Sequence, residues 1–262
     1  MTGKPDRRNR AMTGHSEAAE IVTAGLLVIG DEILSGRTKD KNIGYIAEYL
    51  TAIGVELREV RVVADEETAI VEALNALRSR YCYLFTTGGI GPTHDDITAD
   101  CVAKAFGVSI DHDPTAVALL RARFGGADLN EARMRMARIP AGAELIHNKV
   151  STAPGFRIGN VFVMAGVPTI MQAMLDFVAP TLKTGAKMLS ETLRADAREG
   201  DIGGPLAEIA KAHPGTMIGS YPFFDDKRGP NTNIVVRSRD PARLAAAKTA
   251  VERMLAEVRQ AL

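Results

Sequence analysis

The most constraining feature of the sequence is an alternation of short apolar runs with amphipathic stretches, which begins at Ile21. Apolar runs predict strands, and apolar residues spaced three and four apart predict helices between them. This alternation is typical of a mostly parallel sheet covered by helices, which places the chain in the α/β class. The predicted strands are 21–30, 57–63 and 81–87, and the predicted helices include residues 43–53 and 70–77.

Two loops are predicted to meet at one edge of this sheet. Right-handed crossovers place the loops that follow parallel strands on the same side, where ligands of open α/β folds bind. Loop 31–41 follows the first strand, and the loop that begins at Gly88 follows the third. We therefore expect one site built from both loops.

The length of 262 residues suggests one full domain and a smaller one. After Gly185 the pattern changes to that of a small α+β unit. We expect a leader at 1–20, a first domain at 21–185 and the small domain at 186–262, and the leader is expected to be disordered rather than a basic arm. The elements predicted for the small domain are strands 188–197, 216–224 and 232–238, a helix at 204–212 and a closing helix.

Composition excludes two classes of partner. The 32 basic residues balance 32 acidic ones, so neither nucleic acid nor an anionic membrane is expected.

No apolar run reaches the roughly 18 residues of a membrane span and no hydrophobic export segment is visible, so we expect a cytoplasmic protein. Cys82 and Cys101 form no CxxC pair, and both are expected to be reduced core residues.

The segment 86–98, TTGGIGPTHDDIT, is predicted to join a buried strand to a helix. Gly88, Gly89 and Gly91 allow the backbone to approach an oxygen-rich ligand closely. The helix that begins near Asp96 offers free amides and the positive end of its dipole, so the segment predicts an anion site. The glycine spacing does not continue to GxGxxG, and the chain contains neither GxxxxGKS nor GxxxxGKT, so both common nucleotide fingerprints are absent.

Carboxylates lie next to both loops. Asp31 and Asp40 follow the first strand, and Asp95 and Asp96 follow the glycine turn. Carboxylates at strand ends can hold Mg²⁺ through one or two oxygens while the ion also contacts phosphate. Asp40 or Asp96 alone is more typical of a helix N-cap, but the joint occurrence of these residues favours a metal site.

Residues 114–137 are predicted to be helical with a loop around Gly125–Gly126, and 160–168 to form a strand and a loop before another helix. For the arginines in and just after the first of these segments, a solvated helix face is favoured over phosphate steering. They are Arg121, Arg123, Arg133, Arg135 and Arg138.

Four motifs in this order resemble the molybdopterin-binding (MoaB/Mog-like) domain family, most closely the N-terminal domain of CinA-like competence and damage-inducible proteins. The resemblance covers about residues 21–185 and implies a three-layer α/β/α fold; dimers or trimers are common among family members, so a homo-oligomer is expected. The motifs are GDEILSG at 30–36 with Asp40 and Asn42, TTGGIGPTHDDIT at 86–98, NKVSTAPGF at 148–156 and GVP at 166–168.

The resemblance also implies a groove for a small phosphorylated ligand, namely molybdopterin, ADP-ribose or a related nucleotide. In relatives the chemistry is metal-assisted work on a phosphate or pyrophosphate group. Asp40 and Asp96 are then the expected catalytic residues and the ligands of a divalent metal ion, Mg²⁺ or similar. The expected ligand-binding residues are Gly30, Asp31, Glu32, Asn42, Thr87, Gly88, Gly89, Ile90, Gly91, Pro92, Thr93, Asp95, Thr98, Ala153, Pro154, Gly155, Gly166 and Pro168.

Several positions depart from the family pattern. Ile170 stands where an acidic residue is usual, so any ligand role of that acid is lost, and Ala165 replaces a proline. Ser151 stands where glycine is common. His94 occupies a site that is often basic.

Residues 186–262 resemble the region that follows this domain in short stand-alone relatives and in some eukaryotic FAD synthases. The deamidase domain of full-length CinA-like proteins is not expected in so short a segment. Neither deamidation of nicotinamide mononucleotide nor FAD synthesis is therefore an expected activity.

Three functions are compatible with these features. A metal-dependent pyrophosphatase acting on ADP-ribose or a similar nucleotide is favoured by the acidic residues beside the anion loop. A non-catalytic module that binds molybdopterin or a nucleotide, linked to molybdenum cofactor biosynthesis, is favoured by the missing acid at Ile170. An interaction protein with a vestigial groove is the third.

Overall fold

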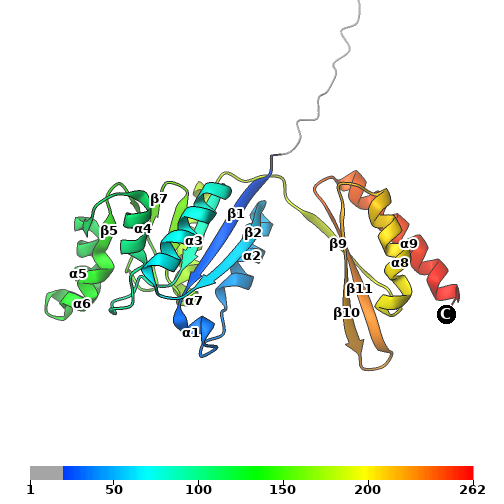
Figure 1. Ribbon diagram of the computed structural model, residues 1–262, viewed down its shortest axis with the longest axis horizontal. Coiled ribbons are helices and arrows are strands. Elements are labelled where there is room, and N and C mark those ends of the chain that lie inside the picture. The colour runs from blue at the N-terminus through cyan, green and yellow to red at the C-terminus, as the bar shows by residue number, and fades with distance from the viewer. Residues whose placement is uncertain (1–19, 262) are drawn as a thin grey trace, which may run out of the picture.

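The computed structural model describes residues 20–261, without the side chains of residues 126, 127 and 261, and consists of two units joined by an extended segment (Figure 1). The larger unit contains a six-stranded sheet and the smaller one a three-stranded sheet. The predicted leader, 1–20, lies outside the described residues except for Glu20.

The large sheet has the strand order β2-β1-β3-β8-β7-β6. β1 pairs in parallel with β2 and β3, and β3 pairs in parallel with β8, whereas β7 and β6 complete the sheet as antiparallel strands. The prediction of a mostly parallel sheet is therefore confirmed. The strands are β1 (Val22–Ile29), β2 (Val55–Val63), β3 (Tyr83–Thr87), β6 (Glu144–Ile146), β7 (Gly155–Ile158) and β8 (Val161–Met164).

Helices cover both faces of this sheet, which confirms the three-layer arrangement (Figure 1). One core includes Leu74, Val102 and Leu120 from three helices, and the other includes Leu50 and Leu175 from two. The helices of the first core are α3 (Glu67–Arg80), α4 (Thr98–Phe106) and α5 (Pro114–Asp128), and those of the second are α2 (Asn42–Ile53) and α7 (Pro168–Val178). The shorter elements are α1 (Asp31–Leu34), α6 (Glu131–Met134) and 3-10 turns at Arg135–Ala137 and Ala179–Thr181.

The burial of β1 explains why this segment forms a central strand. Leu27 and Ile29 belong to the core on one face, whereas Leu26 and Val28 belong to the core on the other. A strand buried on both faces requires a nearly uninterrupted apolar run, which the segment VTAGLLVI provides. β2 lies instead at the edge of the sheet, and its charged residues are Glu56, Arg58, Glu59 and Arg61.

The structure contains short elements that the sequence pattern does not predict. α1 interrupts the expected loop after β1, and β4 (Ile110–His112) and β5 (Arg138–Pro140) form a separate ribbon. These strands, like β6 and β7, have three or four residues, which is too short to show a periodicity. The segment 114–137, predicted to be helical with a loop around Gly125–Gly126, is indeed interrupted there, because Gly125 adopts a non-helical φ of 73° inside α5, and α6 follows separately.

The second unit has two helices on one face of an antiparallel sheet with the order β10-β11-β9, which confirms a small α+β domain. Ile202, Ile234 and Val251 lie at the centre of its core. The first helix begins five residues before the expected 204, and Pro205 lies inside it. The elements are β9 (Leu189–Arg194), α8 (Glu199–Ala212), β10 (Met217–Asp225), β11 (Gly229–Ser238) and α9 (Pro241–Ala261).

The two cysteines lie in different environments. Cys101 is buried in α4, and burial raises the pKa of its thiol to about 12. Cys82 is exposed, at the residue before β3, so its interpretation as a core residue is wrong. Both are free thiols. Within residues 20–261 no helix combines the length and apolar character needed to cross a membrane.

A cluster of charged side chains fixes the loop after β9. The Oδ1 atom of Asp196 accepts hydrogen bonds from Arg194 at 2.7 Å, Arg228 at 3.1 Å and Asn231 at 3.2 Å. Arg194 also donates to Asp225 at 2.6 Å. The hydrogen bond from Arg194 is the main reason why the pKa of Asp196 falls to about 2, below its ordinary value.

The core of the first unit predicts a difference between two leucines. We expect Leu27→Ala to lower the free energy of unfolding by about 2–5 kcal/mol, because the buried side chain leaves a cavity. Leu34, which is 56% exposed on α1, is the matched control, and Leu34→Ala should cost about 0.5 kcal/mol or less. Urea denaturation followed by circular dichroism measures both, and equal losses would contradict the burial of β1.

The Asp196 cluster predicts a dependence of stability on pH. A carboxyl group whose pKa is depressed by folding stabilises the fold above its ordinary pKa, and loses this contribution as the pH falls toward the folded pKa of about 2. We expect Asp196→Asn to lower the melting temperature at neutral pH, and the difference from the parent to shrink between about pH 4 and pH 2. Thermal unfolding at a series of pH values checks this. A difference that does not change with pH would assign the loss to another cause.

Candidate functional site

The loops after β1 and β3 are in direct backbone contact. Gly88 has φ 102° and Gly89 has φ 66°, a region that residues with a Cβ rarely adopt. A Cβ on Gly88 would lie 2.1 Å from the carbonyl oxygen of Ile29, and a Cβ on Gly166 would lie 3.3 Å from the Cα of Gly88. The loops after β1, β3 and β8 therefore converge on one turn, and they can do so because glycines stand there.

Thr98 anchors this turn to α4. Its amide donates to the carbonyl of Gly89 and its Oγ1 donates to the carbonyl of Gly88, each at 3.0 Å. A Cβ on Gly89 would lie only 2.1 Å from that Oγ1 atom. Thr98 is fully buried, so it positions the glycine turn against the N-terminus of the helix and does not face the cavity.

The next turn fixes the carboxylate of Asp96. Its Oδ2 atom accepts hydrogen bonds from the amide of Thr93 at 2.8 Å and from the hydroxyl of Thr93 at 2.5 Å. The Oδ1 atom accepts no hydrogen bond from the described residues and lies 3.0 Å from where a Cβ on Gly91 would be. Thr93 also lowers the pKa of Asp95 through its side chain.

These loops enclose a cavity of about 430 Å³, which we call the strand-end cavity because it lies beyond the carboxyl ends of the parallel strands. Its walls come from the loops after β1, β2, β3 and β8, from the segment before β7, from the 3-10 turn at Arg135–Ala137 and from α7. The lining residues are Ile29, Gly30, Glu32, Asp65, Gly88, Gly89, Ile90, Gly91, Pro92, Asp95, Asp96, Met136, Ser151, Ala153, Pro154, Ala165, Gly166, Val167, Ile170 and Met174.

One side of the cavity is acidic. Glu32, Asp65, Asp95 and Asp96 line it, and Asp31 lies next to them because its amide donates to Asp65 Oδ2 at 2.9 Å. Burial is the main cause of a raised pKa at Asp65, and the charges of Asp31, Glu32 and Asp95 raise it further. The negative charges on this side of the cavity therefore repel one another.

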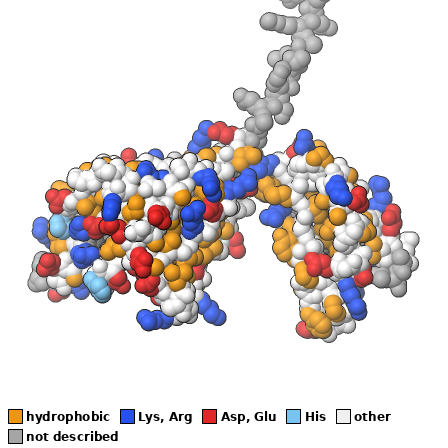
Figure 2. Space-filling model, viewed as in Figure 1, with side chains coloured by type: hydrophobic (Ala, Val, Ile, Leu, Met, Phe, Trp, Pro, Cys, Tyr) orange, Lys and Arg blue, Asp and Glu red, His pale blue; other side chains and the backbone are white. Residues whose placement is uncertain are grey.

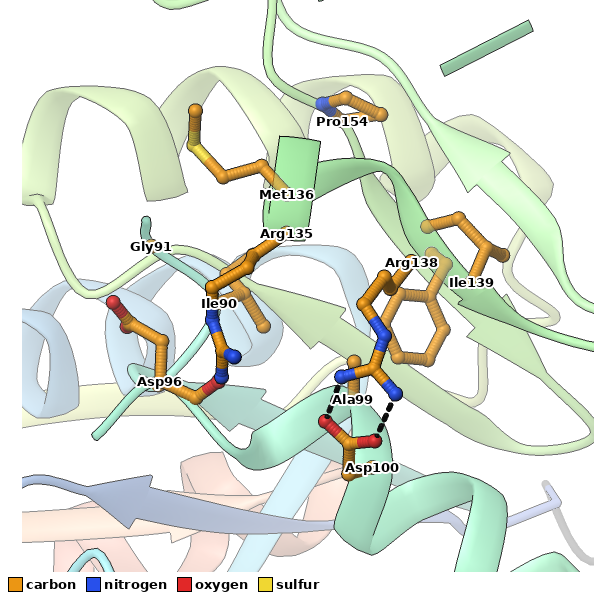
Figure 3. A pocket seen from close by; sticks show the side chains of 12 residues that line it. Ile90, Gly91, Asp96, Ala99, Asp100, Arg135, Met136, Arg138, Ile139 and Pro154 are labelled. Atoms are coloured by element: carbon orange, nitrogen blue, oxygen red, sulfur yellow. Dashed lines mark hydrogen bonds and ion pairs between the residues drawn. The ribbon is translucent and has the colours of Figure 1, made fainter. Parts of the chain in front are cut away.

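Two arginines lie on the other side of the glycine turn (Figure 3). Arg135 donates to the backbone carbonyl of Asp96 at 3.3 Å, and its buried Nε atom has no partner in residues 20–261. Arg138 forms a two-pronged ion pair with Asp100, at 2.6 and 2.7 Å. Both line a small cavity next to Gly89 and Gly91. The interpretation of these two arginines as a solvated helix face is therefore wrong: each is half-buried beside the anion loop.

Asp40 and Asn42 act on the helix that follows them. The Oδ1 atom of Asp40 accepts from the amides of Asn42 at 3.0 Å and Ile43 at 2.7 Å, which caps the N-terminus of α2. Asn42 is buried and donates to the carbonyl of Gly166 at 2.8 Å, so it ties α2 to the loop after β8. Neither side chain lines the strand-end cavity.

The motif at 148–156 forms one wall. Asn148 accepts from the amides of Val150 and Ser151 and donates to the carbonyl of Ala153, so its side chain shapes the turn. Gly155 packs against β8, because a Cβ there would lie 2.2 Å from the carbonyl oxygen of Val163. His94, whose side chain is 98% exposed, does not line the cavity.

The structure thus brings together most of the residues predicted from the sequence. The cavity is lined by Gly30, Glu32, Gly88, Gly89, Ile90, Gly91, Pro92, Asp95, Asp96, Ala153, Pro154 and Gly166. It is not lined by Asp31, Asp40, Asn42, Thr87, Thr93, Thr98, Gly155 or Pro168, of which Thr87 is buried in the core and Pro168 begins α7.

Sequence reasoning missed Asp65 and the apolar wall formed by Met136, Val167 and Met174. Asp65 follows the second parallel strand, so the rule that directed attention to the loops after the first and third strands also applied to it. The two methionines were indistinguishable from core residues in the sequence, because only the packing of α7 and the turn at Arg135–Ala137 brings them to the cavity.

Comparison with known proteins shows similarity along both units. The model of the family described as "Probable molybdopterin binding domain" matches residues 25–184, and that described as "FAD synthase, middle domain" matches residues 187–260. The crystal structure of the protein CinA with unknown function from Thermoplasma acidophilum is 34% identical with a TM-score of 0.59, and covers 62% of this chain and 98% of that chain.

Two curated relatives are longer than this chain. The chain is 30% identical to a protein named probable FAD synthase from Caenorhabditis elegans, over 94% of this chain and 52% of that protein. It is 35% identical to a CinA-like protein from Desulfosudis oleivorans, over 83% of this chain and 55% of that protein. The resemblance inferred from the four motifs is confirmed.

The contact of the glycine turn with β1 predicts the effect of a single methyl group. We expect Gly88→Ala to lower the free energy of unfolding by about 3 kcal/mol or more, because a backbone oxygen occupies the place of the methyl group. Gly107 also has a positive φ, but no atom lies within 4 Å of its Cβ position, so Gly107→Ala should cost only about 1–2 kcal/mol. Chemical denaturation compares them, and equal costs would contradict the contact.

Proposed function

The chain belongs to the molybdopterin-binding domain family, and we propose that it binds a phosphorylated nucleotide in the strand-end cavity and hydrolyses the pyrophosphate bond of ADP-ribose or a similar dinucleotide with the help of a divalent cation. The observation that carries this proposal is the shared wall of the cavity. A glycine turn suited to phosphate and four carboxylates suited to a cation line the same space of about 430 Å³.

The glycine turn supports binding of phosphate oxygens. The amides of Gly89, Ile90 and Gly91 donate to no carbonyl or side chain within residues 20–261. The N-terminus of α4 lies directly behind the turn, since Thr98 is bonded to Gly88 and Gly89. A phosphate group there is stabilised by backbone donors and by the positive end of the helix dipole.

The position of Arg135 also supports binding of a phosphate group at the glycine turn. Its guanidinium lies beside Gly91 and Asp96 (Figure 3), whereas Glu32 and Asp65 line the strand-end cavity. Arg138 is already neutralised by Asp100, whereas Arg135 has no carboxylate partner among the described residues. Arg135 lines the small cavity on the same glycine turn and not the strand-end cavity, so we propose that its positive charge stabilises a phosphate group bound to the amides of the turn.

The donor set fits a hard divalent cation. The cavity offers carboxylate oxygens and no imidazole or thiolate, which suits Mg²⁺ or Mn²⁺ better than zinc. In residues 20–261 no three His, Cys, Asp or Glu side chains converge into a metal site, so a bound ion would have to take its remaining ligands from phosphate and water. Asp96, with Glu32, Asp65 or Asp95, is the proposed holder, since the carboxylate of Asp40 caps α2 and lies outside the cavity.

The chain's own residues then account for orientation and proton transfer. A bound cation would neutralise the pyrophosphate and favour attack at phosphorus. Asp96 is held by Thr93 through Oδ2, so its Oδ1 atom is available to orient a water molecule. Attack of this water on one phosphorus of ADP-ribose, with its proton passing to Asp96 Oδ1, breaks the P–O bond of the bridging oxygen and yields AMP and ribose 5-phosphate.

A non-catalytic binding module is the second candidate. One wall of the cavity is apolar and includes Met136, Val167, Ile170 and Met174, which suits the flat ring of a pterin or a purine. Ile170 stands where relatives carry an acid, so this wall supplies no carboxylate. The same residues would hold molybdopterin or a nucleotide without chemistry, as expected for a protein linked to molybdenum cofactor biosynthesis.

Self-association into a dimer or trimer is proposed from the family resemblance. The exposed apolar side chains of Val150 and Phe177 lie on the first unit and are available for such a contact. Light scattering measures the mass in solution, and a mass of one chain at micromolar concentration would contradict this proposal.

The hydrolysis proposal predicts release of AMP. Purified protein incubated with ADP-ribose or FAD and Mg²⁺, Mn²⁺ or Co²⁺ should produce AMP, quantified by chromatography. Asp96→Asn should lower kcat/KM by about 100-fold or more, because it removes the group proposed to hold the cation and orient water. Asp111→Asn, at a carboxylate whose side chain is 96% exposed outside the cavity, should change little.

Two outcomes separate the candidates. Absence of turnover with every metal, together with a rise of the melting temperature on adding molybdopterin or a nucleotide, would reject the enzyme and support the binding module. Absence of both turnover and binding would reject both proposals. A loss in Asp96→Asn is informative only if that variant melts near the temperature of the parent.

A further inference from the structure

Two further cavities lie where the two units meet, at the end of the large sheet opposite the strand-end cavity. One of about 180 Å³ and one of about 610 Å³ share the wall residues Glu56, Met188, Met217, Arg237 and Arg239. We call the space that they form the junction groove. Its floor is the end of α2 and the start of β2, whereas the strand-end cavity lies at the other end of β1 and β3. The two sites therefore share no residue.

Backbone contacts fix the units around this groove. The amide of Gly185 donates to the carbonyl of Gly54 at 3.1 Å, and a Cβ on Gly54 would lie 2.3 Å from the carbonyl oxygen of Gly185. Across the groove, Arg239 donates to Glu56 at 2.5 Å and to the carbonyl of Ala186 at 3.2 Å. The connecting segment is thus bonded to the first unit at Gly54, and Arg239 of the second unit bonds both to this segment and to β2.

The groove carries more positive than negative charge. Four arginines and two carboxylates line its larger part, and Figure 2 shows basic side chains gathered where the two units meet. Glu56 is shared between Arg58, at 2.9 Å, and Arg239. Arg243 is 3.5 Å from Asp240. Both carboxylates are therefore already paired with an arginine.

The fourth arginine of the groove, Arg237, differs from the three that are paired with carboxylates. In the part of the chain that the structure describes it has no carboxylate partner, and its Nε atom is buried without an acceptor. Its terminal nitrogen donates only to the hydroxyl of Tyr221, at 3.5 Å, which is a long hydrogen bond. Arg237 projects from β11 beside Met217 of β10, its cross-strand neighbour. A guanidinium that lines a cavity without a carboxylate partner favours an anion there.

We propose that the junction groove is a second binding site, which takes the phosphate group of a small phosphorylated molecule. The forked guanidinium of Arg237 would bind two phosphate oxygens, with Arg243 as the second cation. Met188 and Met217 supply an apolar wall for the rest of the molecule. Such a ligand contacts both units at once, and its binding stabilises their relative position.

The groove suits a small molecule better than a nucleic acid. Glu56 and Asp240 interrupt the basic residues, and the whole chain has 32 basic and 32 acidic residues. A polyanion is bound through a continuous basic stripe, which these carboxylates prevent. A single phosphate or pyrophosphate group requires only the arginines at one end of the groove.

Methionine methyl groups allow the two sites to be observed separately. Met188 and Met217 line the junction groove, whereas Met136 and Met174 line the strand-end cavity. Protein labelled with ¹³C at the methionine methyl groups is titrated with inorganic pyrophosphate in EDTA, which removes divalent cations. The signals of Met188 and Met217 should shift and saturate, and those of Met136 and Met174 should shift less.

Variants at Arg237 test the assignment. Arg237→Met should weaken the binding of pyrophosphate at the junction by about tenfold or more. Arg237→Lys, which keeps the charge and loses the fork, should weaken it less. The matched control Arg253→Gln changes an exposed arginine on α9 outside the groove and should leave the affinity unchanged. Unchanged signals of Met136, Met174 and Met254 show that each variant is folded.

Three results would overturn the proposal. The first is a titration in which Met188 and Met217 do not shift. The second is equal weakening in Arg237→Met and Arg253→Gln, which indicates diffuse charge rather than a site. The third is a short single-stranded oligonucleotide that binds more tightly than pyrophosphate at the same ionic strength, which identifies a nucleic-acid surface instead. Loss of ADP-ribose turnover alone does not bear on this groove, because it reports the other cavity.

Discussion

The contact between Gly88 and the carbonyl oxygen of Ile29 is the constraint on which the first unit's site depends. The 2.1 Å separation from a hypothetical Cβ leaves room for glycine alone. Because the ends of β1 and β3 approach so closely, the loops that follow them share a wall. Glu32 and Asp96, far apart in the sequence, then face one cavity. The chemistry of the cavity is a consequence of this approach, since neither loop encloses a ligand by itself.

Much of this arrangement could be predicted from local sequence. The apolar run of β1 is long because both faces of the strand are buried. A buried strand can therefore be predicted from this segment alone, without knowing which strands lie beside it. The glycine turn could be located because three glycines within four residues, directly after an apolar strand, are typical of a backbone that must turn tightly or approach another group closely. The direction of crossovers then placed the loops on one edge, and Gly30, Gly89 and Asp96 do line one cavity there.

The parts that could not be predicted depend on long-range packing or on ambiguous residue types. In the sequence, an aspartate just before a helix, such as Asp40, can be either a helix cap or a metal ligand. Only the structure shows that Asp40 accepts hydrogen bonds from the amides of Asn42 and Ile43, as a cap does. Met136 reaches the cavity through a short turn with no periodicity. Cys82 follows a helix and precedes a strand, where apolar neighbours do not indicate burial. The partners of Arg135 and Arg237 likewise depend on distant elements.

The charged edge strand β2 has a consequence for the aggregation of the folded protein. β1 is apolar along its whole length and contains no charge, so when unpaired it is a template for intermolecular β-aggregation. In the folded sheet β1 lies between β2 and β3, and the outermost strand presents Glu56, Arg58, Glu59 and Arg61 to the surroundings. Alternating charges on an exposed edge disfavour the addition of a foreign strand. β2 therefore protects the apolar strand β1 from pairing with strands of other molecules.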